Sequence, residues 1–383
     1  MKIMPFLKRQ NSVFLTTLIG LILIGILICL PTGYEDALIY QGTERAVGKV
    51  VETDNSAIIT SGLIQSGEQS CMLEIENGNF KGKILEGVNF LSGSLEKDKM
   101  FKEGDRALLT ISCQGDTIRS VVISDHYRLD KEVILLAVFA VFLIIFAGKI
   151  GLQAILSFFI TILMIWKILV PCYLKGYSPV WVGIGITVVL TAIIIFFVYG
   201  LDKRTLTAVS GALLGITTTC ILGILFTGLF KIHGAVMTSS ESLLYSGYQD
   251  LDLTSIFMAS IFIGASGAMM DLAVDITSAV YEVISKKPDI LPAEAVLSGL
   301  RVGRAAMGTM TTTLLLAYSG GYISLLMVFM AQGTPIDHIL NYKYVAAEVL
   351  DTVVGSFGLV TVAPFTSLMA GLLLTRKKGS MPS

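Results

Sequence analysis

The residues best suited to chemistry are acidic side chains inside an apolar segment. Asp271, Asp275, Ser278 and Glu282 follow one another at spacings of four, three and four residues. Because an α-helix has 3.6 residues per turn, this spacing places all four side chains on one helical face. An ionisable group inside a membrane costs roughly 2.5–3.5 kcal/mol on insertion scales, so such groups mark ion or substrate pathways. Asp271 lies deepest in the segment and is the principal candidate.

The same segment contains small residues one to two turns before Asp271. Gly264, Ser266 and Gly267 precede it in an apolar run that extends over residues 255–284. A continuous helix of that length would measure roughly 45 Å, more than a bilayer requires. We therefore expect a break near Gly264–Gly267, as in the discontinuous helices with which transporters expose backbone groups to a substrate.

The next apolar run, residues 305–331, supplies further polar groups. Arg301 and Arg304 are expected at its cytoplasmic entrance, where an arginine could neutralise Glu282 or an aspartate. Glu348 follows at the outer end of the last run. The predicted pathway residues are Asp271, Asp275, Ser278, Glu282, Gly264, Ser266, Gly267, Arg304, Thr309, Thr312, Tyr318 and Asp351.

Each of these residues also has a structural interpretation. Small and hydroxylated residues in membrane helices commonly form packing surfaces, which applies to residues 264–268 and 309–313. Arg301 and Arg304 could serve as positive-inside anchors, and the acidic residues near helix ends could be interfacial.

Composition and hydropathy place the chain in a membrane. Hydrophobic residues make up 54% of the sequence, charged residues 15%, and the mean hydropathy is +0.76. A soluble fold does not need this much apolar sequence. Eight runs of roughly spanning length occur, so we predict a polytopic α-helical protein with about eight transmembrane helices: 13–30, 132–146, 152–170, 180–199, 206–230, 255–284, 305–331 and 349–374.

Lys and Arg residues favour one orientation. With eight spans, the basic connections fall on the side of the amino terminus: Lys149, Lys203, Arg204, Lys286, Lys287, Arg301, Arg304, Arg376, Lys377 and Lys378. The positive-inside rule then makes both termini cytoplasmic and residues 34–131 extracytoplasmic, in an inner membrane. The expected parts are residues 1–33 with the first helix, 34–131, and a seven-helix domain over 132–383.

Residues 34–131 have the pattern of a small all-β domain. Short runs rich in valine and isoleucine alternate with Gly, Asn and Asp turns. We expect about six strands near residues 46–52, 57–60, 70–75, 80–88, 107–111 and 118–123. A closed barrel, such as the five-stranded oligonucleotide-binding type, would leave no exposed edges. Cys71 and Cys113 lie in this domain and could form a disulfide outside the cytoplasm.

Two motifs give the chain a family resemblance. Residues 264–271, Gly-Ala-Ser-Gly-Ala-Met-Met-Asp, and residues 308–313, Gly-Thr-Met-Thr-Thr-Thr, with the Ala-Tyr-Ser-Gly-Gly of 317–321, resemble the YibE/F-like family of bacterial multi-pass membrane proteins. The resemblance extends from the domain containing residues 80–83 through the last span. It implies a permease without an agreed substrate. The family tends to have a small hydroxyl residue at the position of Asp275, which leaves Asp271 as the better candidate.

A secondary transporter coupled to a proton or cation through Asp271 is the leading hypothesis. The first alternative is an assembly factor or sensor whose β domain binds a partner. The second is a Mg²⁺-dependent intramembrane enzyme, in which Asp271 and Asp275 would act with Glu348 and Asp351. We expect no enzyme activity, cofactor, metal or nucleic-acid partner. The expected partners are the lipid bilayer, a small molecule or ion, and a second copy in a homo-oligomer.

Overall fold

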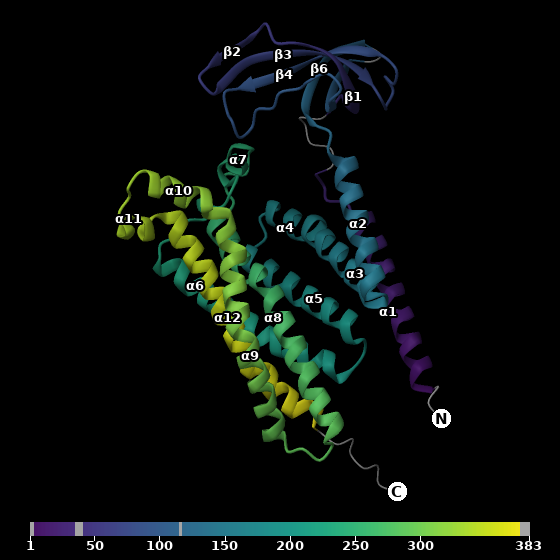
Figure 1. Cartoon of the computed structure of the whole chain (residues 1–383), viewed down its shortest axis with the longest axis vertical. Helices are drawn as coiled ribbons and strands as arrows, with labels where there is room; N and C mark the ends of the chain where they lie inside the picture. The colour runs from purple at the N-terminus through teal and green to yellow at the C-terminus, as the bar shows by residue number, and fades with distance from the viewer. Residues whose placement is uncertain (1–3, 35–40, 115–116, 376–383) are drawn as a thin grey trace. The chain divides into compact units, whose positions relative to one another are not determined.

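A computed structural model describes residues 4–34, 41–114 and 117–375 of the chain (Figure 1). Its contacts divide it into two compact units, residues 33–145 in one and residues 1–32 with 146–383 in the other. The first unit holds six strands and one helix, and the second is helical. Each is considered by itself.

The first unit is built on a closed β-barrel. Its strands are β1 (Thr43–Asp54), β2 (Ile58–Ser61), β3 (Ile64–Ile75), β4 (Ile84–Ser92), β5 (Arg106–Gln114) and β6 (Thr117–His126). The strand order is β1-β5-β6-β4-β3-β2, and an additional β1–β3 pairing closes five strands into a ring, with β2 extending β3 as a hairpin. The small barrel expected from the sequence is confirmed, and closure removes the edges that short strands would expose.

Alternating residues fill the barrel. Along β5 the burial alternates, with Ala107, Leu109 and Ile111 fully buried. Two strand glycines make room for large neighbours: a β-carbon at Gly48 would lie 2.8 Å from Leu109 Cδ1, and one at Gly87 would lie 2.5 Å from Leu73 Cδ1. The fourth strand begins at Ile84 and not at Phe80, because residues 80–83 form a turn that has Gly82 at φ +80°.

A buried amide network fastens the segment between β4 and β5. Gln69 is fully buried and donates to the carbonyl of Phe101 at 2.9 Å, while its amide oxygen accepts from the Phe101 N–H at 3.0 Å. Asn89 donates to Gln69 at 3.1 Å and to the carbonyl of Lys99 at 2.7 Å. Cys71 and Cys113 are free thiols, and their strands do not pair them, so the disulfide considered from the sequence is not formed.

The helical unit contains six helical segments that are long and apolar enough to cross a membrane, counted over the described residues. The helices of the chain are α1 (Met4–Cys29), α2 (Leu129–Ala147, in the first unit), α3 (Lys149–Met164), α4 (Val170–Leu174), α5 (Pro179–Tyr199), α6 (Lys203–Leu229), α7 (Ser240–Tyr245), α8 (Leu253–Lys286), α9 (Pro292–Ser319), α10 (Ile323–Ala331), α11 (Ile336–Asn341) and α12 (Lys343–Leu374). The other two predicted spans coincide with α1 and α2. The total of eight spans stays a prediction.

Helices α6, α8, α9 and α12 form the centre of the helical unit (Figure 1). Small residues let α6 and α12 approach closely: a β-carbon at Gly215 would lie 2.0 Å from Val362 Cγ2, and one at Gly211 would lie 2.2 Å from Thr366 Oγ1. Close contact between small residues is the usual way that membrane helices associate. Helices α1, α3 and α5 form a second cluster, in which the amide of Gln153 donates to Thr16 Oγ1 at 2.9 Å.

Two helix starts differ from the sequence expectation. Helix α9 begins at Pro292, with the proline in its first turn, and not at Ala305. Arg301 therefore lies nine residues, or roughly 14 Å, inside the helix and not at its entrance. Helix α12 begins at Lys343, which places Glu348 and Asp351 within its first turns. Asp252 caps α8 by accepting from Ser255, and these hydrogen bonds lower the pKa of the Asp252 carboxyl.

Candidate functional site

Four predicted pathway residues share one face of α8, as their spacing indicated. Asp271, Asp275, Ser278 and Glu282 are all exposed, while Leu272, Ala273 and Ile276 on the opposite face are fully buried against the neighbouring helices. Asp271 lies near the midpoint of this 34-residue helix. Over the described residues, neither Asp271 nor Asp275 forms an ion pair with a basic side chain.

The break expected near Gly264–Gly267 is absent, because α8 is one continuous helix from Leu253 to Lys286. In an apolar environment every backbone N–H and C=O must be satisfied, and an uninterrupted helix does this within one segment. Ser266 is buried, and its hydroxyl donates to the carbonyl of Ile263 at 2.6 Å, so its hydrogen bond is made within α8. Gly267 remains on the exposed face with open space beyond its Cα.

Gly264 brings a neighbouring helix onto α8. A β-carbon at this position would lie 2.9 Å from the hydroxyl oxygen of Tyr318 on α9. Further along, a β-carbon at Gly303 would lie 3.2 Å from Ile276 Cδ1, and one at Gly299 would lie 3.0 Å from Val280 Cγ2. The two helices therefore run antiparallel, side by side. Ile276 of α8 and Gly303 of α9 have the same depth.

The helix interruption lies after α9. A 3₁₀ turn, Gly320–Tyr322, separates α9 from α10. Helices commonly bend or break at small residues, here Ser319, Gly320 and Gly321. The seventh apolar run is thus discontinuous, whereas the sixth is not.

Carboxyl groups of α12 lie beside this interruption. Tyr318 interacts electrostatically with Asp351 and Glu348. The side chain of Tyr322 forms a hydrogen bond with the Glu348 carboxyl. One oxygen of Glu348 and one of Asp351 are buried without a hydrogen-bond partner among the described residues. A buried carboxyl oxygen without a partner is costly, and it becomes favourable only when a cation or a proton binds there.

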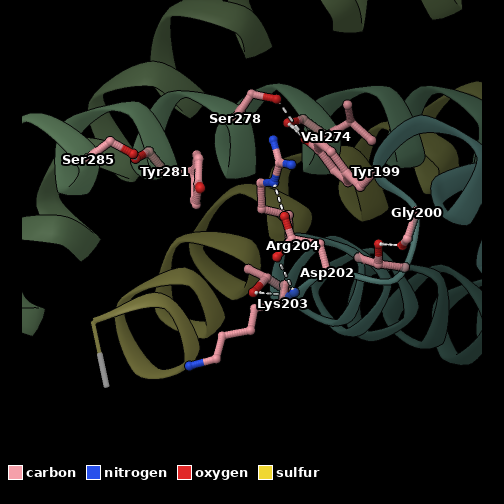
Figure 2. Close-up of polar contacts among 11 residues, drawn as sticks. Tyr199, Gly200, Asp202, Lys203, Arg204, Val274, Ser278, Tyr281 and Ser285 are labelled. Atoms are coloured by element: carbon pink, nitrogen blue, oxygen red, sulfur yellow. Dashed lines mark hydrogen bonds and ion pairs between the residues drawn. The ribbon is translucent and has the colours of Figure 1, made fainter. Parts of the chain in front are cut away.

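The other end of the α8 face meets the α5–α6 connection (Figure 2). The Tyr199 hydroxyl donates to the carbonyl of Val274 at 2.6 Å and lies 2.6 Å from the hydroxyl of Ser278. Tyr199 also interacts electrostatically with Asp275, which in turn interacts with Asp271. The α5–α6 connection therefore contacts the exposed face of α8 next to Asp271 and Asp275.

The positively charged side chain of Arg204 lies at the same end of the α8 face. The guanidinium of Arg204 lies 4.9 Å from the ring centre of Tyr199 and 4.5 Å from that of Tyr281, and its Nε is 2.6 Å from Asp202 Oδ2 (Figure 2). Cations are attracted to aromatic faces at such distances. The sequence interpretation assigned Arg204 to membrane orientation alone and gave Tyr199 no role. An interfacial tyrosine five residues before an arginine, between two apolar runs, is the signal that could have identified both.

The remaining predicted residues make other contacts or are exposed. Glu282 forms an ion pair with Lys286 on its own helix at 2.9 Å, so no arginine neutralises it. Arg301 and Arg304 are exposed and form no ion pair over the described residues. The Thr309 hydroxyl donates to the carbonyl of Ala306 at 3.1 Å, and Thr312 is exposed.

Together these contacts connect into one series, which we call the polar row. It comprises Glu348, Asp351, Tyr318, Gly264, Asp271, Asp275, Ser278 and Tyr199. The steps from Asp351 to Tyr318, from Asp271 to Asp275 and from Asp275 to Tyr199 are electrostatic interactions. The step from Gly264 to Asp271 runs along two turns of α8 past Gly267. Helix geometry makes this step roughly 10 Å. Among the described residues, no group of three or more His, Cys, Asp or Glu side chains is placed to hold a single metal ion.

The comparisons identify the membrane domain. A family model described as YibE/F-like protein matches residues 135–376. The match does not include the β-barrel, to which the sequence resemblance had been extended. Neither the curated proteins nor the solved structures give a significant match.

Proposed function

This chain belongs to the YibE/F-like family, and from that premise we propose that it is a membrane transporter coupled to a proton or small cation along the polar row. The observation that carries the proposal is Asp271. It is a carboxyl group near the midpoint of a spanning helix, exposed, and without a basic partner among the described residues. Ionisable residues at this depth are costly unless they serve a pathway.

The polar row offers a route for a positive charge. It contains two pairs of carboxyl groups and the hydroxyl groups of Tyr318, Ser278 and Tyr199, and such oxygen atoms are suited to hard cations and to proton transfer. The stretch at Gly264 and Gly267 exposes backbone where side chains are absent. Arg204 at one end, held between two tyrosines, would limit the passage of further cations by repulsion.

The orientation is part of the same proposal. Basic residues flank the Tyr199 end of the row, at Lys203, Arg204, Lys286 and Lys287. By the positive-inside rule this end faces the cytoplasm, and the Glu348–Asp351 end faces the outside of a bacterial inner membrane. Both chain termini would then be cytoplasmic and the β-barrel extracytoplasmic.

A binding screen over many ions and metabolites tests the proposal and requires no choice of a single substrate. A ligand that binds only the folded state stabilises it by about 2.7 kcal/mol at one hundred times its dissociation constant. We expect one or more ions or metabolites, or a change of pH, to raise the melting temperature of the purified protein, and Asp271→Asn to abolish the response. Glu282→Gln is the matched control, since its carboxyl is paired with Lys286 at the helix end. An equal response in wild type and Asp271→Asn would contradict a coupling role.

A specific surface supports the assembly or sensor alternative. On the barrel, the β2–β3 hairpin exposes Ile59 (71%), Leu63 (84%) and Ile64 (47%), and the loop after β4 exposes Leu95 (73%). Gly93 lies next to Ile64, with a β-carbon position 3.2 Å from Ile64 Cγ2. Grouped apolar side chains on a surface commonly mark partner sites. A stable partner that co-purifies with the full chain and is lost in Leu63→Lys would favour this alternative.

A further inference from the structure

The guanidinium of Arg204 has hydrogen-bond donors that the fold does not use. Its Nε donates to Asp202 Oδ2 at 2.6 Å, and Asp202 is fixed in turn by accepting from the backbone N–H of Lys203 at 2.6 Å. A guanidinium has five N–H groups, four of them on its two terminal nitrogens. Among the described residues, no acceptor takes a hydrogen bond from either terminal nitrogen. The donors of a permanent cation are therefore free to bind a ligand.

Two tyrosines hold this guanidinium in one place. Its central carbon lies over the ring of Tyr199 on α5, 4.9 Å from the ring centre, and over the ring of Tyr281 on α8, 4.5 Å from the centre. Aromatic faces attract a cation and leave its N–H groups without a strong acceptor. Figure 2 shows the terminal nitrogens turned toward Ser278 and away from Asp202. A guanidinium held in this way loses less conformational entropy when it binds a ligand.

The same guanidinium is accessible from outside. The side chain of Arg204 is 30% exposed, Tyr281 is 41% exposed, and Ser278 lies on the exposed face of α8. A partly buried arginine with only a structural role commonly has its donors paired within the protein. Here the free donors lie on an accessible side chain that Asp202, Tyr199 and Tyr281 keep in position.

The arrangement favours a singly charged oxyanion. The two terminal nitrogens form a planar fork that matches two oxygen atoms bonded to one carbon or one phosphorus atom. The positive charge of Arg204 is already partly offset by Asp202. Asp275 adds a negative charge within electrostatic range of Tyr199. Both carboxylates would repel a dianion, whereas a carboxylate or a phosphodiester carries a single charge.

We propose that Arg204, surrounded by Tyr199, Tyr281 and Ser278, binds a singly charged oxyanion, a carboxylate or a phosphodiester, through its two terminal nitrogens. Both groups occur in soluble small molecules, and the phosphodiester also occurs in phospholipid headgroups. The proposal does not depend on cation transport. Because Ser278 and Tyr199 also belong to the polar row, the anion would be bound at that end of the row.

Modification of arginine by phenylglyoxal tests the site in the wild-type protein. The reagent adds to the terminal nitrogens of a guanidinium, and mass spectrometry of the peptides gives the rate at each arginine. The full-length protein is kept in dodecyl maltoside, which has no oxyanion, and receives sodium acetate, sodium dimethyl phosphate or phosphatidylglycerol. Sodium chloride at equal ionic strength is the reference. We expect at least one of these additions to slow modification of Arg204 by about fivefold. The rate at Arg304, an exposed arginine without an ion pair among the described residues, should not change.

Substitution gives a second readout, the melting temperature. The anion that protects Arg204 should also raise the melting temperature of the full-length protein, because it binds the folded state. Arg204→Lys keeps the charge and loses the planar fork, so it should lose this rise. Lys203→Gln is the matched control and should keep it, because the Lys203 side chain points away from the site in Figure 2.

The three additions distinguish the sources of the anion. Protection by acetate or dimethyl phosphate would assign the site to a soluble molecule, and protection by phosphatidylglycerol alone would assign it to a lipid headgroup. Modification of Arg204 that no addition slows, equal slowing at Arg304, or a full rise in melting temperature in Arg204→Lys would each overturn the proposal.

Discussion

The hydroxyl of Tyr318 lies against the backbone of Gly264, where a β-carbon would be 2.9 Å away. This single contact connects the carboxyl pair of α12 to the acidic face of α8, because Tyr318 interacts with Asp351 and Gly264 lies two helical turns from Asp271.

A side chain at Gly264 should interrupt the polar row. Gly264→Leu would displace the Tyr318 hydroxyl from α8 while leaving the fold intact, since the displaced group is the end of a flexible side chain. We expect the melting temperature to change little and the ligand-induced rise in melting temperature to be lost. Gly185→Leu, at an open position on α5, should keep that rise. An unchanged ligand response in Gly264→Leu would show that the row does not pass this point.

The α6–α12 contact should tolerate no added methyl group. In Gly215→Ala the new β-carbon would lie 2.0 Å from Val362 Cγ2, so the two helices must separate. Overpacking of this kind costs about 1–3 kcal/mol, and the melting temperature of the membrane domain should fall. Gly185→Ala, with nothing within 4 Å, should be neutral or slightly stabilising. Equal melting temperatures for the two variants would contradict the close packing.

The Tyr199 hydroxyl should stabilise the junction of α5 and α8. Tyr199→Phe removes the bonds to Val274 and Ser278, each 2.6 Å long. A net loss of about 0.5–1.5 kcal/mol per hydrogen bond is expected, measured as a lower melting temperature. Tyr245→Phe serves as the control, because Tyr245 is 86% exposed and outside this cluster. A Tyr199→Phe protein as stable as this control would argue against a structural role for the contact.

The β-barrel should lose stability in acid through Asp98. Its carboxylate accepts backbone N–H groups of Ser92 at 2.9 Å, Gly93 at 2.6 Å and Ser94 at 2.9 Å. These hydrogen bonds, that of Ser92 foremost, lower the pKa of Asp98 in the folded state. The stabilisation is therefore present above the unfolded pKa of about 3.9 and is lost as the pH falls through the folded value.

Labelling of Cys71 by a dipyridyl disulfide measures this effect. Cys71 is buried inside the barrel, where desolvation also raises the pKa of its thiol to about 11, so the thiol reacts when the barrel opens. At pH 7, the barrel of the Asp98→Asn variant should open at a lower urea concentration than that of wild type. The difference between the two urea midpoints should become smaller near pH 3. Glu96→Gln in the same loop should behave as wild type. A constant difference between Asp98→Asn and wild type at both pH values would refute the assignment.

Periodicity predicted the parts of the fold that depend on local sequence. The barrel strands, the long apolar helices and the common face of Asp271, Asp275, Ser278 and Glu282 follow from side-chain spacing alone. The sequence also contained an unused signal for the start of α9, because Pro292 followed by Glu294 is typical of a first helical turn.

The position of the helix interruption and the direction of the acidic face depend on tertiary contacts, which side-chain periodicity does not predict. Gly264 and Gly320 are the same residue type in similar apolar surroundings, yet only the helix at Gly320 is interrupted. At Gly264, against which the Tyr318 hydroxyl lies, α8 continues without interruption. Likewise, spacing does not say whether the acidic face of α8 points inward or outward, and it gave no role to Tyr199, which contacts that face from 75 residues away.

Charge movement in proteoliposomes tests the central claim most directly. Wild-type protein, Asp271→Asn and Glu282→Gln are adsorbed on a solid-supported membrane and exposed in turn to gradients of protons, monovalent cations and divalent cations. We predict a transient current under at least one gradient for wild type and Glu282→Gln, and its loss in Asp271→Asn. Equal currents in wild type and Asp271→Asn, or no current in wild type under any of these gradients, would contradict coupling through Asp271.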